Sequence, residues 1–89
     1  MKMLIVVLRD EDVDNVLKAL IDSSFGVTRI ASTGGFFRRG NTTLIIGTED
    51  DRVDAAMDVI RSHSTPPEDT THRRATVFVL NVDRFEKLN

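Results

Sequence analysis

The alternation of apolar and polar residues along the chain predicts four strands and two helices. The first strand, residues 1–8, is apolar on both alternating faces, which is typical of a strand covered above and below. The other strands are expected at residues 27–31, 42–47 and 75–82, and a loop at residues 62–71 holds both prolines. The helically spaced apolar positions are Val13, Val16, Leu17, Leu20 and Ile21 in the first helix and Val53, Ala56, Met57 and Ile60 in the second.

Acidic residues open both predicted helices. Asp10 is expected to be the N-cap of the first helix, with Glu11 and Asp12 after it, and the acids at residues 49–51 hold the corresponding place before the second. Negative charge is favourable at a helix N-terminus, so capping explains these acids better than catalysis by paired carboxylates.

The two strand-helix segments repeat. Laying residues 4–21 over residues 44–61, at an offset of 40, superposes Leu4 on Leu44, Ile5 on Ile45, Asp10 on Asp50, Val13 on Val53, Asp14 on Asp54 and Leu20 on Ile60. The resulting order βαββαβ predicts a ferredoxin-like α+β fold. Its four-stranded antiparallel sheet has the first and third strands in the centre and both helices on one face. Residues 1–89 are expected to form this single domain.

The sheet face opposite the helices is expected to be apolar as well. Met3, Ile5 and Val7 alternate with an equally apolar set in the first strand, and Phe78 and Leu80 do so in the last. A contiguous apolar face of this kind is typical of an interface, so we expect a homo-oligomer closed by sheet packing. In the alternative interpretation, the C-terminal segment folds over this face.

Composition excludes several classes of function. The 89 residues include 12 basic and 14 acidic side chains, a net charge of −2, which removes the diffuse attraction of a nucleic-acid coat or a polybasic membrane binder. The chain has no cysteine, and therefore no disulfide, thiolate metal site or cysteine nucleophile, in keeping with a cytoplasmic location. The apolar residues 1–8 are too few for a signal sequence or a membrane span.

Residues 33–43 form the most unusual stretch of the chain. It holds three of the five glycines together with Phe36, Phe37, Arg38 and Arg39, and it has no acid. Glycines let backbone N–H groups approach an anion, arginine clamps phosphate, and phenylalanine offers a face to a purine, so the stretch suits a nucleotide. A hairpin with solvated arginines remains the alternative.

Other nucleotide-binding and catalytic motifs do not fit. Gly35 and Gly40 have a Walker A spacing, but the lysine is missing and the segment precedes a strand instead of opening a helix. The strand at residues 42–47 lacks the exposed aromatics of an RNA-recognition domain. His63 and His72 have no cysteine partners and no helical spacing, so we expect solvated histidines, no metal site and no enzyme.

Several motifs together resemble a known family. They are Thr33-Gly34-Gly35-Phe36 with Arg38, Gly40-Asn41-Thr42-Thr43, Gly47, Asp50-Asp51-Arg52-Val53-Asp54, Ala75-Thr76-Val77-Phe78-Val79, Val82-Asp83 and Phe85. The chain resembles the PII-like cyclic di-AMP receptor family, small trimeric signalling proteins without known catalysis. The resemblance covers nearly the whole chain.

This resemblance implies a PII-like protomer, a homotrimer, and binding of cyclic di-AMP or another adenine nucleotide at the subunit boundaries. It implies no cofactor, and a protein partner that the sequence does not identify. Of the two arginines, Arg38 matches the family motif and is expected to reach phosphate. The ligand-binding residues that we expect are Thr28, Gly35, Phe36, Phe37, Arg38, Asn41, Gly47 and Phe78.

The chain departs from the family pattern at three places. It has Gly26 where family members tend to carry arginine, Arg84 where they carry glutamine, and a shorter loop at residues 62–74. These departures leave a second interpretation open: a PII-like trimeric interaction module that does not bind cyclic di-AMP. The glycine-rich stretch favours the receptor.

Overall fold

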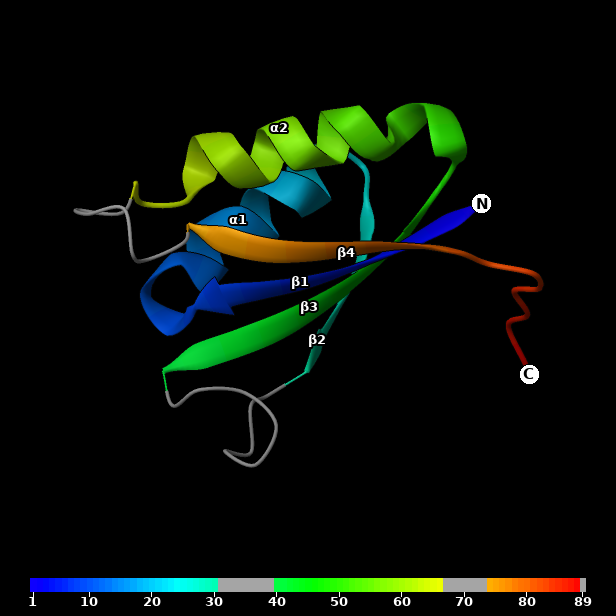
Figure 1. Cartoon of the computed structure of the whole chain (residues 1–89), viewed down its shortest axis with the longest axis horizontal. Coiled ribbons are helices and arrows are strands. Elements are labelled where there is room, and N and C mark those ends of the chain that lie inside the picture. The colour runs from blue at the N-terminus through cyan, green and yellow to red at the C-terminus, as the bar shows by residue number, and fades with distance from the viewer. Residues whose placement is uncertain (31–39, 67–73, 89) are drawn as a thin grey trace.

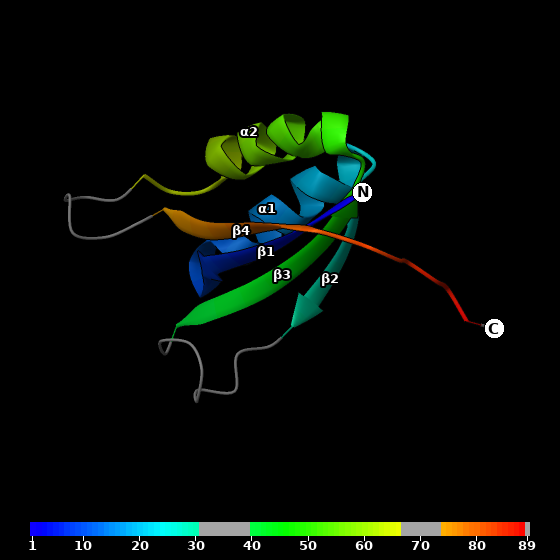
Figure 2. The same cartoon turned by 45° about the vertical axis from the view of Figure 1, so that its right-hand side comes forward.

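The ferredoxin-like α+β fold is confirmed by a computed structural model, which describes residues 1–30, 40–66 and 74–88 (Figure 1). The strands form one antiparallel sheet in the order β2-β3-β1-β4, and both helices cover the same face of it (Figures 1 and 2). The elements are β1 (Lys2–Arg9), α1 (Asp10–Asp22), β2 (Gly26–Ile30), β3 (Asn41–Thr48), the 3-10 helix η1 (Asp50–Arg52), α2 (Val53–His63) and β4 (Ala75–Asn81).

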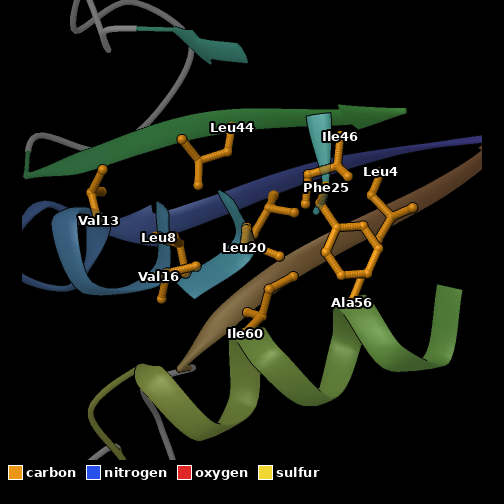
Figure 3. Packing of buried hydrophobic residues seen from close by; sticks show 11 residues of the cluster. Leu4, Leu8, Val13, Val16, Leu20, Phe25, Leu44, Ile46, Ala56 and Ile60 are labelled. Atoms are coloured by element: carbon orange, nitrogen blue, oxygen red, sulfur yellow. The ribbon is translucent and has the colours of Figure 1, made fainter. Parts of the chain in front are cut away.

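The helix-covered face of the sheet and the inner sides of both helices share one apolar core (Figure 3). The register places Leu4 opposite Ile46 and Val6 opposite Leu44, all four fully buried. Burying one aliphatic side chain of this size is worth about 1.5–3 kcal/mol, so these pairs fix which side of each central strand faces the helices. The core consists of Leu4, Val6, Leu8, Val13, Val16, Leu20, Phe25, Leu44, Ile46, Ala56 and Ile60.

The prediction that Asp10 is the N-cap of α1 is wrong. Arg9 occupies the N-cap position, and no side chain caps the helix. Asp10 is the first helical residue, and its Oδ1 accepts a hydrogen bond from the Thr42 hydroxyl at 2.5 Å. The N-cap of η1, Glu49, likewise makes no side-chain cap. The acids do lie in the first turns, where the helix dipole favours them.

The loop after α2 begins later than predicted. The helix continues to His63, and Ser64 follows it with an extended backbone. The Ser64 hydroxyl donates to the carbonyl oxygen of Ile60 at 2.7 Å, which satisfies one of the carbonyls left free at a helix end.

The face of the sheet opposite the helices, here called the open face, is apolar and partly exposed. Phe78 is 54% exposed, Leu80 41% and Ile30 43%. Residues 83–88 continue past the end of the sheet instead of turning back across it, so the alternative in which they cover this face is wrong (Figure 2). The open face comprises Met3, Ile5 and Val7 of β1, Gly26, Thr28 and Ile30 of β2, Thr43, Ile45 and Gly47 of β3, and Thr76, Phe78 and Leu80 of β4.

None of the helices in the described ranges is both long enough and apolar enough to cross a membrane.

Candidate functional site

One row of residues crosses the open face and ends in two of the predicted site residues. Thr28 of β2 lies opposite Ile45 of β3, and Ile45 lies opposite Ile5 of β1. Ile5 in turn lies opposite Phe78 of β4. β2 and β4 are the two edge strands, and three strand spacings separate them, about 14 Å. Within one chain, Thr28 and Phe78 are therefore too far apart to contact the same base.

Gly26 and Gly47 face each other across β2 and β3, and we call this pair the glycine corner. Both glycines are exposed, and a Cβ built on either would meet nothing within 4 Å. Neither has a positive φ. Packing within the chain therefore does not require glycine here, and the corner leaves bare backbone beside Thr28 on which a flat ring can lie.

Asn41 lies at the other end of β3. It is six positions from Gly47, about 20 Å along an extended strand. Asn41 is half-buried, opposite Arg9, and strand alternation puts it on the side of the open face. Gly40, just before it, has φ +90°, a left-handed conformation that glycine adopts without strain. Asn41 therefore marks a second part of the candidate site, next to residues 31–39.

Thr43 is a site candidate that sequence reasoning missed. Its side chain is 4% exposed, and its Oγ1 has no hydrogen-bond partner among the described residues. It lies on the open face between Val7 and Ile30. Buried hydroxyls are generally paired, so a partner from outside the described residues is expected at this position. The Thr42-Thr43 pair in the family motif was the available signal.

Four predicted site residues, Gly35, Phe36, Phe37 and Arg38, lie outside the described residues. The other four all belong to the open-face side of the sheet but fall into three separate places: Thr28 with Gly47 at the glycine corner, Asn41 at the far end of β3, and Phe78 on the opposite edge.

Charges of both signs meet at the glycine-corner end of the sheet. The ammonium of Met1 is 3.0 Å from Asp50 Oδ1, and this hydrogen-bonded contact holds the pKa of the exposed Asp50 carboxyl below its usual value. Lys2, opposite Thr48, lowers the same pKa further. The positive charge at the start of β1 is thus partly compensated by Asp50.

His63 is exposed at the end of α2, and its Nδ1 lies 2.9 Å from the carbonyl oxygen of Val59. Across residues 1–30, 40–66 and 74–88, three or more potential metal ligands do not come together at any point. Together with Asn41, the described residues of the open face offer backbone, hydroxyl, amide and aromatic contacts.

Comparison with known proteins identifies the family. Residues 1–73 match the sequence model of a family described as cyclic-di-AMP receptor. The chain belongs to the cyclic-di-AMP receptor family. The receptor match ends before β4, so Phe78 lies outside it.

A crystal structure also resembles this member of the receptor family along its whole length. It is that of a functionally unknown protein from Pediococcus pentosaceus ATCC 25745, with 34% sequence identity and a TM-score of 0.80. The similarity covers 98% of this chain and 96% of that chain, so it includes β4.

Proposed function

We propose that the protein is a non-enzymatic, cytoplasmic signalling receptor that binds cyclic di-AMP, or a related adenine nucleotide, at the subunit boundaries of a homotrimer. Membership of the cyclic-di-AMP receptor family supports the ligand class. In this proposal, a protein partner recognises whether the receptor has bound its ligand.

The main support for a ligand site at a subunit boundary is the distance between Thr28 and Phe78. The two residues end the same row at opposite edges of the sheet, about 14 Å apart. A neighbouring copy whose β4 lies near β2 supplies its phenylalanine to the glycine corner, which one chain alone cannot do. The base then lies on bare backbone on one side and against an aromatic face on the other.

The exposed apolar residues support the assembly. Ile30, Phe78 and Leu80 leave more than a third of their surface in water, and Phe85 and Leu88 of the C-terminal segment are 59% and 88% exposed. Apolar surface exposed on the open face and on the C-terminal segment of an 89-residue domain favours association, because a small domain buries a limited share of its apolar surface alone.

The chemistry of cyclic di-AMP fits the residue types that we expect in the site. Its two purines suit phenylalanine faces and the glycine corner, and its two phosphodiesters suit backbone amides and Arg38. It carries no terminal triphosphate, and the glycine-rich stretch has no P-loop lysine.

Titration calorimetry tests this proposal. We expect cyclic di-AMP to bind saturably at one molecule per chain, three per trimer, and to outcompete ATP. Cyclic di-GMP, with the same backbone but different bases, is the control and should bind far more weakly. Saturable binding of ATP without heat from cyclic di-AMP would overturn the ligand assignment.

The second candidate is a PII-like trimeric module that does not bind the nucleotide, and the glycine corner is what favours it. The corner has no side chain where the family resemblance leads us to expect arginine. A melting assay separates the two candidates, because a ligand at 100 times its Kd stabilises a protein by about 2.7 kcal/mol. A panel of adenine nucleotides that leaves the melting temperature unchanged would favour the module.

A further inference from the structure

Residues 9–12, which we call the 9–12 turn, are the last residue of β1 and the first turn of α1, and they contact the segment that begins β3. Oδ1 of Asp10 accepts a hydrogen bond from the Thr42 hydroxyl at 2.5 Å. The backbone N–H of Asp10 donates to the carbonyl oxygen of Gly40 at 2.8 Å. Asp10 therefore holds both neighbours of Asn41, a residue of the proposed ligand site.

The same turn also contacts the segment that follows α2. The Thr65 hydroxyl donates to Asp12 Oδ1 at 2.6 Å, and Arg9 donates to the Thr65 carbonyl oxygen at 2.5 Å. Arg9 also pairs with Asp12 Oδ2 at 3.4 Å. Arg9 is also the register partner of Asn41 in β3. The 9–12 turn therefore contacts both the segment that begins β3 and the segment that follows α2.

These contacts replace the usual anchor of a helix start. The first turn of α1 has no side-chain N-cap, and helix ends without one open easily. Thr42 and Thr65 hold this turn from two sides. Asp12 is only 2% exposed, and a buried carboxylate that loses a donor must regain one from water. When the Thr65 hydroxyl is removed, the Asp12 carboxylate regains a hydrogen-bond donor only if water reaches it, and water reaches it when the 9–12 turn opens. Asp10 lies in the same turn and moves with it.

We propose that the 9–12 turn is a positioning element that couples the segment after α2 to the Gly40–Thr42 end of the ligand site. Thr65 then tunes nucleotide binding at Asn41 through Asp12 and Asp10, without touching the ligand. This rests on the proposed function for its ligand effect, while the coupling itself is measurable without ligand.

Native-state hydrogen exchange of the unliganded protein tests the coupling. Thr65→Val removes the hydroxyl and keeps the side-chain shape, and Thr65→Ser keeps the hydroxyl. The control is Ser64→Ala, which removes the neighbouring hydroxyl bonded to the carbonyl of Ile60, outside the 9–12 turn. The readout is exchange of the Asp10 amide, normalised to amides in the middle of β1.

We expect Thr65→Val to speed Asp10 exchange by about threefold or more, within the usual range of coupling between sites, and Thr65→Ser to restore it. Ser64→Ala should leave the normalised rate unchanged. Equal acceleration in Thr65→Val and Ser64→Ala, or none in either, would overturn the coupling.

Calorimetry on the same variants tests the ligand effect. We expect Thr65→Val to weaken cyclic di-AMP binding by about threefold or more relative to Ser64→Ala, with Thr65→Ser at the wild-type affinity. Wild-type protein that binds no nucleotide refutes the proposed function, and hydrogen exchange still decides the coupling. Wild-type binding that Thr65→Val leaves unchanged refutes the link from Thr65 to the ligand.

Discussion

Gly26 is a side-chain-free position where the family resemblance leads us to expect arginine. Its φ is not positive and a Cβ there meets nothing within 4 Å, so a larger residue fits the strand. We expect Gly26→Arg to fold normally and to tighten cyclic di-AMP binding by about tenfold. The long arginine side chain extends beyond the backbone on which the base is proposed to lie, and a charge-assisted hydrogen bond from its guanidinium to the adjoining phosphodiester is worth about 1.5 kcal/mol.

Calorimetry at two salt concentrations checks this expectation. Gly26→Gln is the matched control, because it adds similar length without charge. The gain of Gly26→Arg should shrink as salt rises. If Gly26→Gln tightens binding equally, the gain comes from packing, and the arginine side chain does not reach a phosphate.

Asn41 offers an amide that both donates and accepts hydrogen bonds beside Gly40. Asn41→Ala is expected to weaken cyclic di-AMP binding by about 1–3 kcal/mol, because the ligand groups that it satisfies become buried and unpaired. The measurement is the dissociation constant from titration. Asn15→Ala, on the exposed side of α1, is the control and should bind as the wild type does. Unchanged affinity in both variants would remove Asn41 from the site.

The contacts at the helix ends follow the internal repeat. Asp12 and Arg52 occupy corresponding positions at the offset of 40. Asp12 near the start of α1 reaches Thr65 after α2, and Arg52 just before α2 reaches Ser23 and Ser24 after α1. Each helix start therefore holds the end of the other helix. The Asp12–Thr65 contact belongs to the turn whose Arg9 is paired with Asn41, and the Arg52 contacts lie just before Gly26 of the glycine corner.

Arg52 is expected to stabilise the turn that leads into β2. Its guanidinium donates to the carbonyl oxygens of Ser23 at 2.8 Å and Ser24 at 3.3 Å, and lies 4.1 Å from the ring centroid of Phe25. Ser24 has φ 67°, a conformation that needs support in a residue with a side chain. Arg52→Ala should lower the free energy of unfolding by about 1–2 kcal/mol.

Urea unfolding measures this loss. The control is Arg61→Ala, because the Arg61 side chain makes an exposed pair with Asp58 one helical turn away, and such pairs contribute less than about 0.5 kcal/mol. If Arg52→Ala lowers the free energy of unfolding no more than Arg61→Ala does, the Arg52 side chain does not stabilise the turn that leads into β2.

The strands and helices were predictable because burial imposes local periods of two and 3.6 residues. The repeat gave the same elements independently: Leu4 and Leu44, and likewise Leu20 and Ile60, are buried. The end of α2 and the role of Asp10 were not predictable in this way. Asp10 pairs with Thr42, 32 residues away, and a contact at that separation leaves no mark in a local pattern.

The candidate site was predictable as a set of residue types but not as an arrangement. The family resemblance singled out Thr28, Gly47 and Phe78, and the topology expected from the repeat put them in one sheet. Only the strand register shows that Thr28 and Phe78 end the same row at opposite edges. The burial of Thr43 likewise depends on neighbours from other strands, and its hydroxyl looks ordinary in the sequence.

At the level of the assembly, the structure now assigns the two faces of β1. Ile5 lies on the open face and is half-buried, whereas Val6 points into the core and is fully buried. Burying a charge is unfavourable at either position. At Ile5 the charge would be buried only when subunits associate, whereas at Val6 it would be buried when the chain folds. Ile5→Asp should therefore give a folded monomer, and Val6→Asp an unfolded chain.

Light scattering combined with circular dichroism distinguishes these outcomes. Wild-type protein at micromolar concentration is expected at about three times the 10.0 kDa of one chain, and Ile5→Asp at 10.0 kDa with its secondary structure intact. Because Thr28 and Phe78 lie on opposite edges of one sheet, the monomer should also lose cyclic di-AMP binding. A wild-type mass of 10.0 kDa would refute the trimer. A monomeric Ile5→Asp variant that binds as tightly as the wild type would place the site within a single chain.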